Sequence, residues 1–274
     1  MKYKLTANAI EIEGKEDFDI EHILECGQVF SFQKTESGYT VWSKDKMCKV
    51  CETSTGWLIE TADVEYFENY FDLKTDYSKI KKDLAQYPIL QKPIEYGKGI
   101  RILKQDLFET VISFIVSANN NIKRIKMILQ RIREKFGTAK DGFFAFPTRE
   151  QLLQATEQDF VALGAGYRAK YLFEVARQVD DDTLSQWKSL PTMQLRKQLM
   201  TLMGVGPKVA DCILLFGYGK GDVFPVDTWI AQMYNKFYQQ EDNRERIRNL
   251  LTNQFEELSG YAQQYLFFYM RAGQ

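Results

Sequence analysis

The stretch GVGPKVADC, residues 204–212, places a lysine directly after a turn rich in glycine and proline. Lys208 falls in the first turn of the helix that we predict over KVADCILLF, where the helix dipole disfavours a second positive charge. Partial burial would disfavour the cationic form further. A neutral amine is a nucleophile that can attack a carbonyl-like carbon and form a Schiff base. We therefore expect nucleophilic chemistry at Lys208.

An aspartate further along the chain, Asp227 in FPVDTWIAQMY, has two compatible roles. Aspartate is a favoured N-cap residue, so Asp227 would begin the helix TWIAQMY. A fixed carboxylate facing Lys208 could also stabilise a cationic transition state at a sugar carbon. Both roles can hold together, because a cap fixes the side chain that would face Lys208.

A helix-hairpin-helix over about residues 192–216 must position this lysine. The segment TMQLRKQLMTL would bury Leu195, Leu199 and Leu202 on one face, and Pro207 suits the first position of the second helix. Glycines tolerate backbone angles that other residues resist, and free N–H groups at such a turn can bind a phosphate. We therefore predict phosphate binding by Gly204, Val205 and Gly206. A simple helix–turn–helix connection without a ligand remains the alternative.

Two periodicities indicate an α+β fold. The runs VFSFQ, YTVWS, MCKVCE and WLIE within residues 1–60 are strand-like and are separated by turn residues, which predicts a small antiparallel sheet with a helix over 19–25. After about Asp63 the apolar residues follow helical spacing, as in IKRIKMILQRIREKF, residues 122–136. We predict a sheet domain with flanking helices over 1–98 and a mostly helical domain over 99–274.

Composition argues against several protein classes. No apolar run reaches the roughly 18 residues that cross a bilayer, and MKYKLTANAIEIEG lacks the apolar core of a signal peptide. We therefore expect an intracellular protein without membrane contact. Cys48 and Cys51 would point to opposite faces of a strand, and no second pair completes a zinc site, so we expect neither metal nor cofactor. A metal or redox role is the minor alternative, and the single histidine, His22, is predicted to be structural.

Several motifs in order resemble the helix-hairpin-helix DNA glycosylases. GVGPKVADC with the downstream PVD resembles the superfamily, and further stretches are similar to its 8-oxoguanine DNA glycosylases. These stretches are CGQVFSF (26–32), GIRILKQD (99–106), SANNNIKRI (117–125), LGAGYRAKY (163–171) and AQQYLFFYMR (262–271). The chain has no four-cysteine cluster, which argues against an iron–sulfur glycosylase. It also has Thr228 and Trp229 where many relatives place a histidine that touches phosphate.

The resemblance implies a monomeric, bifunctional enzyme acting on double-stranded DNA that contains an oxidised purine. Such an enzyme extrudes the damaged nucleotide into a pocket. By resemblance, Lys208 displaces 8-oxoguanine from the sugar C1′ and forms a Schiff base, which permits β-elimination and a strand nick. Asp227 would assist electrostatically.

The resemblance also implies residues that recognise the extruded base. The carbonyl of Gly27 would accept the N7–H that 8-oxoguanine has and guanine lacks, which can separate the two bases strongly. Gln263 would bond the Watson–Crick edge, and Cys212 and Phe267 would contact the two faces. An ordinary core position is the alternative for Phe267.

Four further residues are implied on the opposite strand. Asn119 would fill the space left by the extruded nucleotide, and Tyr167 would insert as a wedge. Arg124 and Arg168 would donate to the orphaned cytosine. The helix 122–136 is rich in basic residues, so we expect it to face phosphates.

Two other functions remain open. A related glycosylase could act on a different damaged base, and a non-catalytic hairpin module could simply hold DNA. The pair Lys208 and Asp227 counts against the second, because backbone amides bind phosphate without either side chain.

Overall fold

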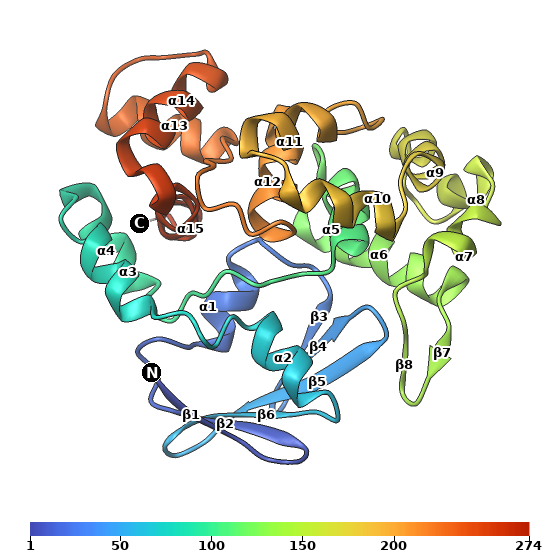
Figure 1. Ribbon diagram of the computed structural model, residues 1–274, viewed down its shortest axis with the longest axis horizontal. Coiled ribbons are helices and arrows are strands. Elements are labelled where there is room, and N and C mark those ends of the chain that lie inside the picture. The colour runs from blue at the N-terminus through green and yellow to red at the C-terminus, as the bar shows by residue number, and fades with distance from the viewer. Residues whose placement is uncertain (274) are drawn as a thin grey trace.

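A six-stranded antiparallel sheet forms the lower lobe of the molecule in Figure 1. The computed structural model describes residues 1–273. Its strands are β1 (Lys2–Leu5), β2 (Ala9–Glu13), β3 (Phe32–Thr35), β4 (Gly38–Ser43), β5 (Lys46–Glu52) and β6 (Gly56–Glu60). They lie in the order β1–β2–β6–β5–β4–β3, so β1 and β3 form the two edges.

One face of this sheet is buried. In β4 every second residue, Tyr39, Val41 and Ser43, is buried, which is the pattern of a sheet with one covered face. Helices α1 (Ile20–Glu25) and α2 (Val64–Tyr70) contribute side chains to the same core. Asp19 begins α1 by accepting the backbone N–H groups of Glu21 and His22 at 2.9 and 3.1 Å.

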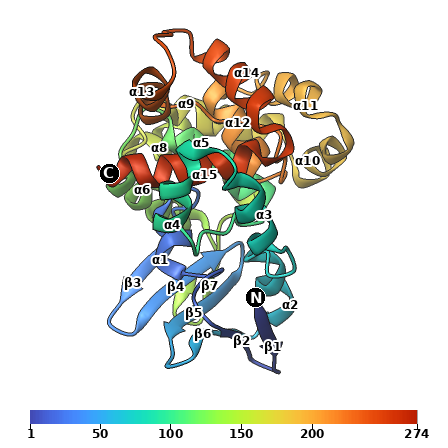
Figure 2. The ribbon, with the colours of Figure 1, turned by 90° about the vertical axis from the view of Figure 1, so that its left-hand side faces the viewer.

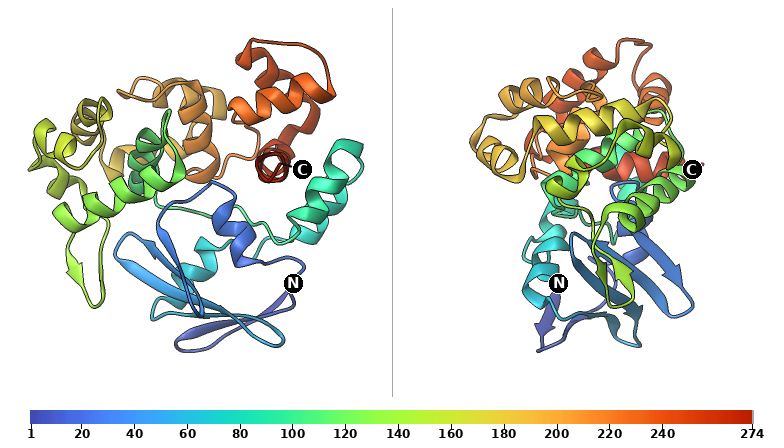
Figure 3. Two further views of the ribbon diagram at one scale, coloured as in Figure 1. Left: turned by 180° about the vertical axis from the view of Figure 1, so that it is seen from behind. Right: turned by 90° about the vertical axis from the view of Figure 1, so that its right-hand side faces the viewer.

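The upper lobe is helical (Figures 1 and 2). Its longer helices are α3 (Tyr77–Leu84), α4 (Pro88–Tyr96), α5 (Leu107–Ser117), α6 (Ile122–Phe136), α9 (Arg168–Gln178), α11 (Thr192–Leu199), α12 (Pro207–Phe216), α13 (Thr228–Phe237), α14 (Arg244–Phe255) and α15 (Ser259–Arg271). Shorter helices are α7 (Arg149–Leu153), α8 (Glu157–Ala162), α10 (Asp181–Gln186) and two 3-10 turns, Trp187–Ser189 and Glu256–Leu258. A small hairpin, β7 (Ala139–Lys140) and β8 (Phe143–Phe144), hangs beside the sheet in Figures 1 and 3.

The helical lobe has two cores. Residues 107–116 of α5 are all buried, and this helix packs against α6, α9, α10 and α12. A second core joins α3 and α4 to α13, α14 and α15. Residues 77–96 therefore pack with the last helices of the chain. The predicted domain boundary between residues 98 and 99 stays a prediction.

The α+β fold class is confirmed, and some elements differ from expectation. Strands β1 and β2 and the hairpin β7–β8 were not predicted. β1 is a mostly exposed edge strand whose sequence does not alternate apolar and polar residues, and β7 and β8 have only two residues each. Cys48 is buried and Cys51 half-buried, on opposite faces of β5 as predicted. Within residues 1–273 no helix combines the length and apolar character that a membrane span requires.

Candidate functional site

The helix-hairpin-helix forms as predicted, from α11, a tight turn and α12. Gly204 has a φ of +86°, and a Cβ there would lie 2.7 Å from the ring of Tyr171. Only glycine fits such a position. Gly206 begins α12 with an ordinary φ of −86° and has open space where a Cβ would be. Gly206 therefore does not use the conformational freedom of glycine here, and its contact with phosphate stays a prediction.

Lys208 lies in the first turn of α12 and is half-buried. Its amine lies 5.7 Å from the centre of the Phe114 ring. None of the ion pairs formed among residues 1–273 includes it. Lys208 therefore lies beside the Phe114 ring and has no ion-pair partner within the described residues 1–273.

Asp227 caps α13, as its sequence position predicts. One carboxylate oxygen accepts the backbone N–H of Ile230 at 2.9 Å. The cap fixes the side chain at the start of the helix, half-buried. A carboxylate held in this way keeps its orientation without a second protein partner.

The charges of both Lys208 and Asp227 act on the Cys212 thiol. Burial raises the pKa of Cys212 to about 11, the positive charge of Lys208 opposes that shift, and the negative charge of Asp227 adds to it. Cys212 follows Lys208 by one helical turn, so α12 presents both on one face. Lys208 and Cys212 therefore lie on one face of α12, and Asp227, at the start of α13, is near enough for its charge to act on the same thiol.

Gly27 and Phe267 meet across the two lobes. Gly27 has a φ of +81°, and a Cβ on it would lie 2.9 Å from Cε1 of Phe267. Phe267 is half-buried, although its neighbours Leu266 and Phe268 in α15 are buried. Phe267 therefore packs at the edge of the core of the C-terminal helices and against the turn that carries Gly27, and its contact with a base stays a prediction.

Gln263 lies one turn before Phe267 on α15 and is buried. Its Oε1 accepts the side-chain N–H of Gln264 at 2.9 Å. Among residues 1–273 its own Nε2 has no hydrogen-bond acceptor. An amide donor that is left free in this way can recognise the edge of a base.

The four residues predicted to face the opposite strand also come together. Asn119 is exposed at a φ of +49°, and Tyr167 is 55% exposed with its hydroxyl donating to Ala118 O at 3.2 Å. Arg124 is exposed and donates to Gly164 O at 3.1 Å. The loop after α5 and the start of α9 therefore form one surface.

Arg168 differs from its neighbours because it points inward. It is buried, with Nε 2.8 Å from Ala118 O and Nη2 2.7 Å from Asn119 O. In this structure the guanidinium holds the loop that carries Asn119. Its direct contact with an orphaned cytosine stays a prediction, for which Nη1 is the least engaged nitrogen of the guanidinium.

The expectation for helix 122–136 as a phosphate-facing surface was wrong for one of its faces. Arg133 is buried and pairs with Glu109 and Ser31, and Lys126 is half-buried over the ring of Phe32. These side chains face the sheet lobe, because the apolar stripe of α6 leaves them on its inner flank. Arg124 remains on the outer side.

An ion network behind the hairpin was not predicted. Asp211 accepts Arg196 Nε at 2.8 Å and Arg248 Nε at 3.0 Å, and Arg196 also pairs with Glu245 at 2.7 Å. The network joins α11, α12 and α14. Its signal in the sequence is weak, since an aspartate inside the apolar helix KVADCILLF becomes informative only when its distant arginines are known.

Comparison with known proteins agrees with this arrangement. Residues 10–111 match the 8-oxoguanine DNA glycosylase N-terminal domain, and residues 112–257 match the HhH-GPD superfamily of base excision DNA repair proteins. A probable N-glycosylase/DNA lyase of Methanothermobacter thermautotrophicus is 32% identical, with 76% of this chain and 74% of that protein covered. The N-glycosylase/DNA lyase of Saccharomyces cerevisiae is 39% identical over 57% of this chain, and the matched part spans 46% of its length.

A solved structure agrees over the whole chain. The Clostridium acetobutylicum 8-oxoguanine glycosylase/lyase, in complex with double-stranded DNA containing cytosine opposite 8-oxoguanine, superimposes with a TM-score of 0.92 at 38% identity. The superposition covers 100% of this chain and 98% of that one. With both domain matches and the shared hairpin, this chain belongs to the 8-oxoguanine DNA glycosylase family of the HhH-GPD superfamily.

Proposed function

We propose that this protein excises 8-oxoguanine opposite cytosine from double-stranded DNA and then nicks the strand as a lyase. The observation that carries this proposal is that Lys208 and Cys212 lie on one face of α12 and that Asp227 is near enough for its charge to act on the same thiol. The comparisons support it, because similar proteins are named a probable N-glycosylase/DNA lyase and an 8-oxoguanine glycosylase/lyase. The protein would act on DNA inside the cell and as a monomer.

The first chemical step is a substitution at the sugar. The nitrogen lone pair of Lys208 forms a bond to C1′ as the glycosidic bond breaks, and the base leaves with the electrons of that bond and takes up a proton while the nitrogen loses one. The carboxylate of Asp227 stabilises the positive charge that develops on the sugar. The sugar ring then opens to give a Schiff base on Lys208.

The second step uses the same covalent adduct. The Schiff base acidifies C2′, a base removes a C2′ proton, and the 3′ phosphate leaves by β-elimination. Water then hydrolyses the imine and restores the amine. The chemistry needs a nucleophile and a fixed carboxylate, which α12 and the cap of α13 supply.

Base selection takes place where the lobes meet. The carbonyl of Gly27 would accept the N7–H of 8-oxoguanine, Gln263 would donate to the Watson–Crick edge, and Phe267 and Cys212 would contact the faces. Guanine lacks the N7–H and would leave a buried carbonyl without its donor, which is a strong basis for rejection. Tyr167, Asn119 and Arg124 would engage the opposite strand.

Borohydride trapping tests the nucleophile. We expect sodium borohydride to reduce the Schiff base and trap a protein–DNA adduct on a duplex with 8-oxoguanine opposite cytosine. Lys208→Gln should abolish the adduct and keep DNA binding, whereas Lys197→Gln, a change of an exposed lysine on α11, should retain it. An adduct that persists in Lys208→Gln contradicts the assignment.

A lesion panel tests the substrate. Single-turnover excision of 8-oxoguanine opposite each of the four bases should be fastest opposite cytosine. Equal rates on alkylated bases would favour a glycosylase of another specificity. Binding without excision on any lesion would favour a non-catalytic DNA-binding module.

A further inference from the structure

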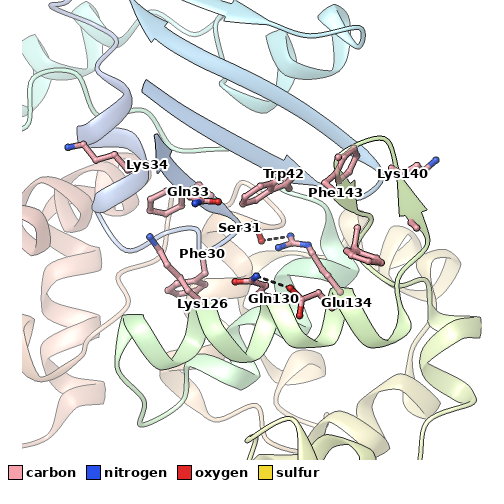
Figure 4. A pocket seen from close by; sticks show the side chains of 15 residues that line it. Phe30, Ser31, Gln33, Lys34, Trp42, Lys126, Gln130, Glu134, Lys140 and Phe143 are labelled. Carbon is pink, nitrogen blue, oxygen red and sulfur yellow. Dashed lines mark hydrogen bonds between the residues drawn. The ribbon is translucent and has the colours of Figure 1, made fainter. Parts of the chain in front are cut away.

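A groove lies between β3, α6 and the β-hairpin β7–β8 (Figure 4), away from the helix-hairpin-helix that carries Lys208. Its volume is about 790 Å³, and its lining includes the five consecutive residues 30–34. Neighbouring residues of a strand point to opposite faces of the sheet, so a lining by consecutive residues means that the groove runs along the strand edge. Lys208, Asp227 and Gly27 are not part of it.

The strand along this groove has an unpaired edge. β3 is the last strand of the sheet, and Trp42 N donates to Ser31 O at 2.9 Å. Because bonded pairs alternate in an antiparallel ladder, Gln33 pairs with Thr40, and the backbone groups of Phe32 and Lys34 face outward. An open edge beside a helix can accept a peptide as an added strand.

The lining carries excess positive charge. Lys34, Lys126 and Lys140 line the groove, and Glu134 is the acidic residue of that lining. The amine of Lys126 lies 3.3 Å from the Phe32 ring centre, and its nearest paired carboxylate, Glu25, is 4.0 Å away. The lysines at either end pair with single exposed carboxylates. An occupant with carboxylates would complement this surface.

Two buried donors in the lining have no acceptor among residues 1–273. They are Nε1 of Trp42 and Nε of Arg133. Arg133 is 6% exposed, and Trp42 reaches from the sheet toward α6 while Phe143 approaches from the hairpin (Figure 4). Buried donors are nearly always bonded, so a small shift of the covering side chains would let carbonyl or carboxylate oxygens of an occupant pair with them.

The groove is on the opposite side of α6 from the residues proposed to touch DNA. Arg124 and Arg131 donate to Gly164 and Leu163, whereas Lys126 and Gln130 line the groove next to the sheet. Residues two apart on a helix lie on different faces. The groove therefore fits an occupant other than the duplex in the active site.

We propose that this groove binds an extended, acidic segment of a partner protein, which adds to the free edge of β3 as a further strand. Backbone bonds to Phe32 and Lys34 would fix the strand, carboxylates would meet the three lysines, and an apolar side chain would contact Trp42 and Phe143. This inference is independent of the glycosylase chemistry.

Selection from a phage library of random peptides about eight residues long, followed by fluorescence anisotropy with the selected peptides, tests the proposal. We expect acid-rich peptides whose affinity falls at least about tenfold for Lys34→Glu/Lys140→Glu. Lys82→Glu, which changes an exposed lysine on α3, should bind as the wild type does. Excision of 8-oxoguanine should stay within about twofold in both proteins, which separates this test from that of the glycosylase activity.

A proline distinguishes strand addition from simple ion pairing. Lys34→Pro removes the charge and an outward-facing backbone N–H, and proline is tolerated in an edge strand. Lys34→Gln removes the charge alone. Strand addition predicts weaker peptide binding for Lys34→Pro than for Lys34→Gln, at unchanged melting temperature. Equal affinities of the two variants would overturn the addition of a strand to β3. Selected peptides without acidic residues would overturn the preference for an acidic segment. If single-stranded oligothymidylate binds in place of peptide and its binding depends on the lysines, the proposal of a protein partner is wrong.

Discussion

At the scale of single residues, the site depends on positions where only one side chain fits. Gly27 and Gly204 have positive φ angles and touch aromatic rings, so glycine is required at both. Lys208 and Asp227 take their places from helix starts. Turn chemistry and the family resemblance made these residues predictable. The inward direction of Arg168 was not predictable, because it depends on two carbonyls of a distant loop.

Gly27→Ala should impair excision more than strand nicking. The new Cβ would lie 2.9 Å from Phe267 in a backbone conformation that costs a non-glycine residue about 1–2 kcal/mol. We expect single-turnover excision of 8-oxoguanine to fall by about tenfold or more. Nicking at a preformed abasic site needs Lys208 and no base, so it should change by less than about threefold. Equal losses in both assays would remove Gly27 from base recognition.

The reactivity of Cys212 should report on Lys208. Since burial raises the pKa of this thiol to about 11, iodoacetamide should label it slowly at neutral pH and faster as the pH approaches that value. Lys208→Gln removes a positive charge that stabilises the thiolate, so the rise should move to higher pH. Mass spectrometry of the labelled peptides measures this, with Cys51 on β5 as the control that should not move. A shift to lower pH would contradict the proximity of the two residues.

At the scale of elements, periodic patterns made most helices and four strands predictable. The apolar stripe of α6 and the alternation of buried and exposed residues in β4 can both be recognised within one short segment of sequence. β1 has no such pattern because it is an exposed edge strand, and it is held in the sheet by its pairing with β2. The network around Asp211 joins three helices across long sequence separations, so a local pattern could not reveal it.

The two glycines of the hairpin form a matched pair. Gly204→Ala should destabilise the turn by at least about 1–2 kcal/mol, because it combines a positive φ with a contact of 2.7 Å to Tyr171. Gly206→Ala has an ordinary φ and no atom within 4 Å of the new Cβ. We expect urea unfolding and duplex binding to change strongly for the first variant and little for the second. A strong loss of duplex binding for Gly206→Ala at unchanged stability would contradict this expectation and would show that DNA approaches Gly206 too closely for any side chain.

At the scale of the whole molecule, the site exists only where the lobes meet. Gly27 comes from the sheet lobe, Phe267 from the last helix, and Lys208 from the hairpin. The sequence predicted both lobes but not their three cores, in which α3 and α4 join the C-terminal helices. Such packing depends on contacts between residues far apart in the chain, which periodicity does not record.

Gln28 ties the base-recognition turn to the segment that connects the lobes. It is fully buried, its Nε2 donates to Ile23 O and Arg101 O at 2.9 and 2.7 Å, and its Oε1 accepts Leu103 N–H at 2.8 Å. Gln28→Ala would leave these buried backbone groups without a hydrogen-bond partner. Each fully buried group that stays unpaired costs about 1–3 kcal/mol of folding free energy. The turn that carries Gly27 would then lose its fixed distance to α15.

We therefore expect Gln28→Ala to lower the free energy of unfolding by about 2–3 kcal/mol and to slow excision of 8-oxoguanine more than nicking of an abasic site. Gln33→Ala, an exposed change on β3, should leave both activities and the stability unchanged. Urea unfolding and the two single-turnover assays make the comparison at a temperature where each variant is folded. If the folded Gln28→Ala protein excises the base as fast as the wild type, the carbonyl of Gly27 is positioned by the contact with Phe267 alone, and the connection between the lobes contributes stability without selecting the substrate.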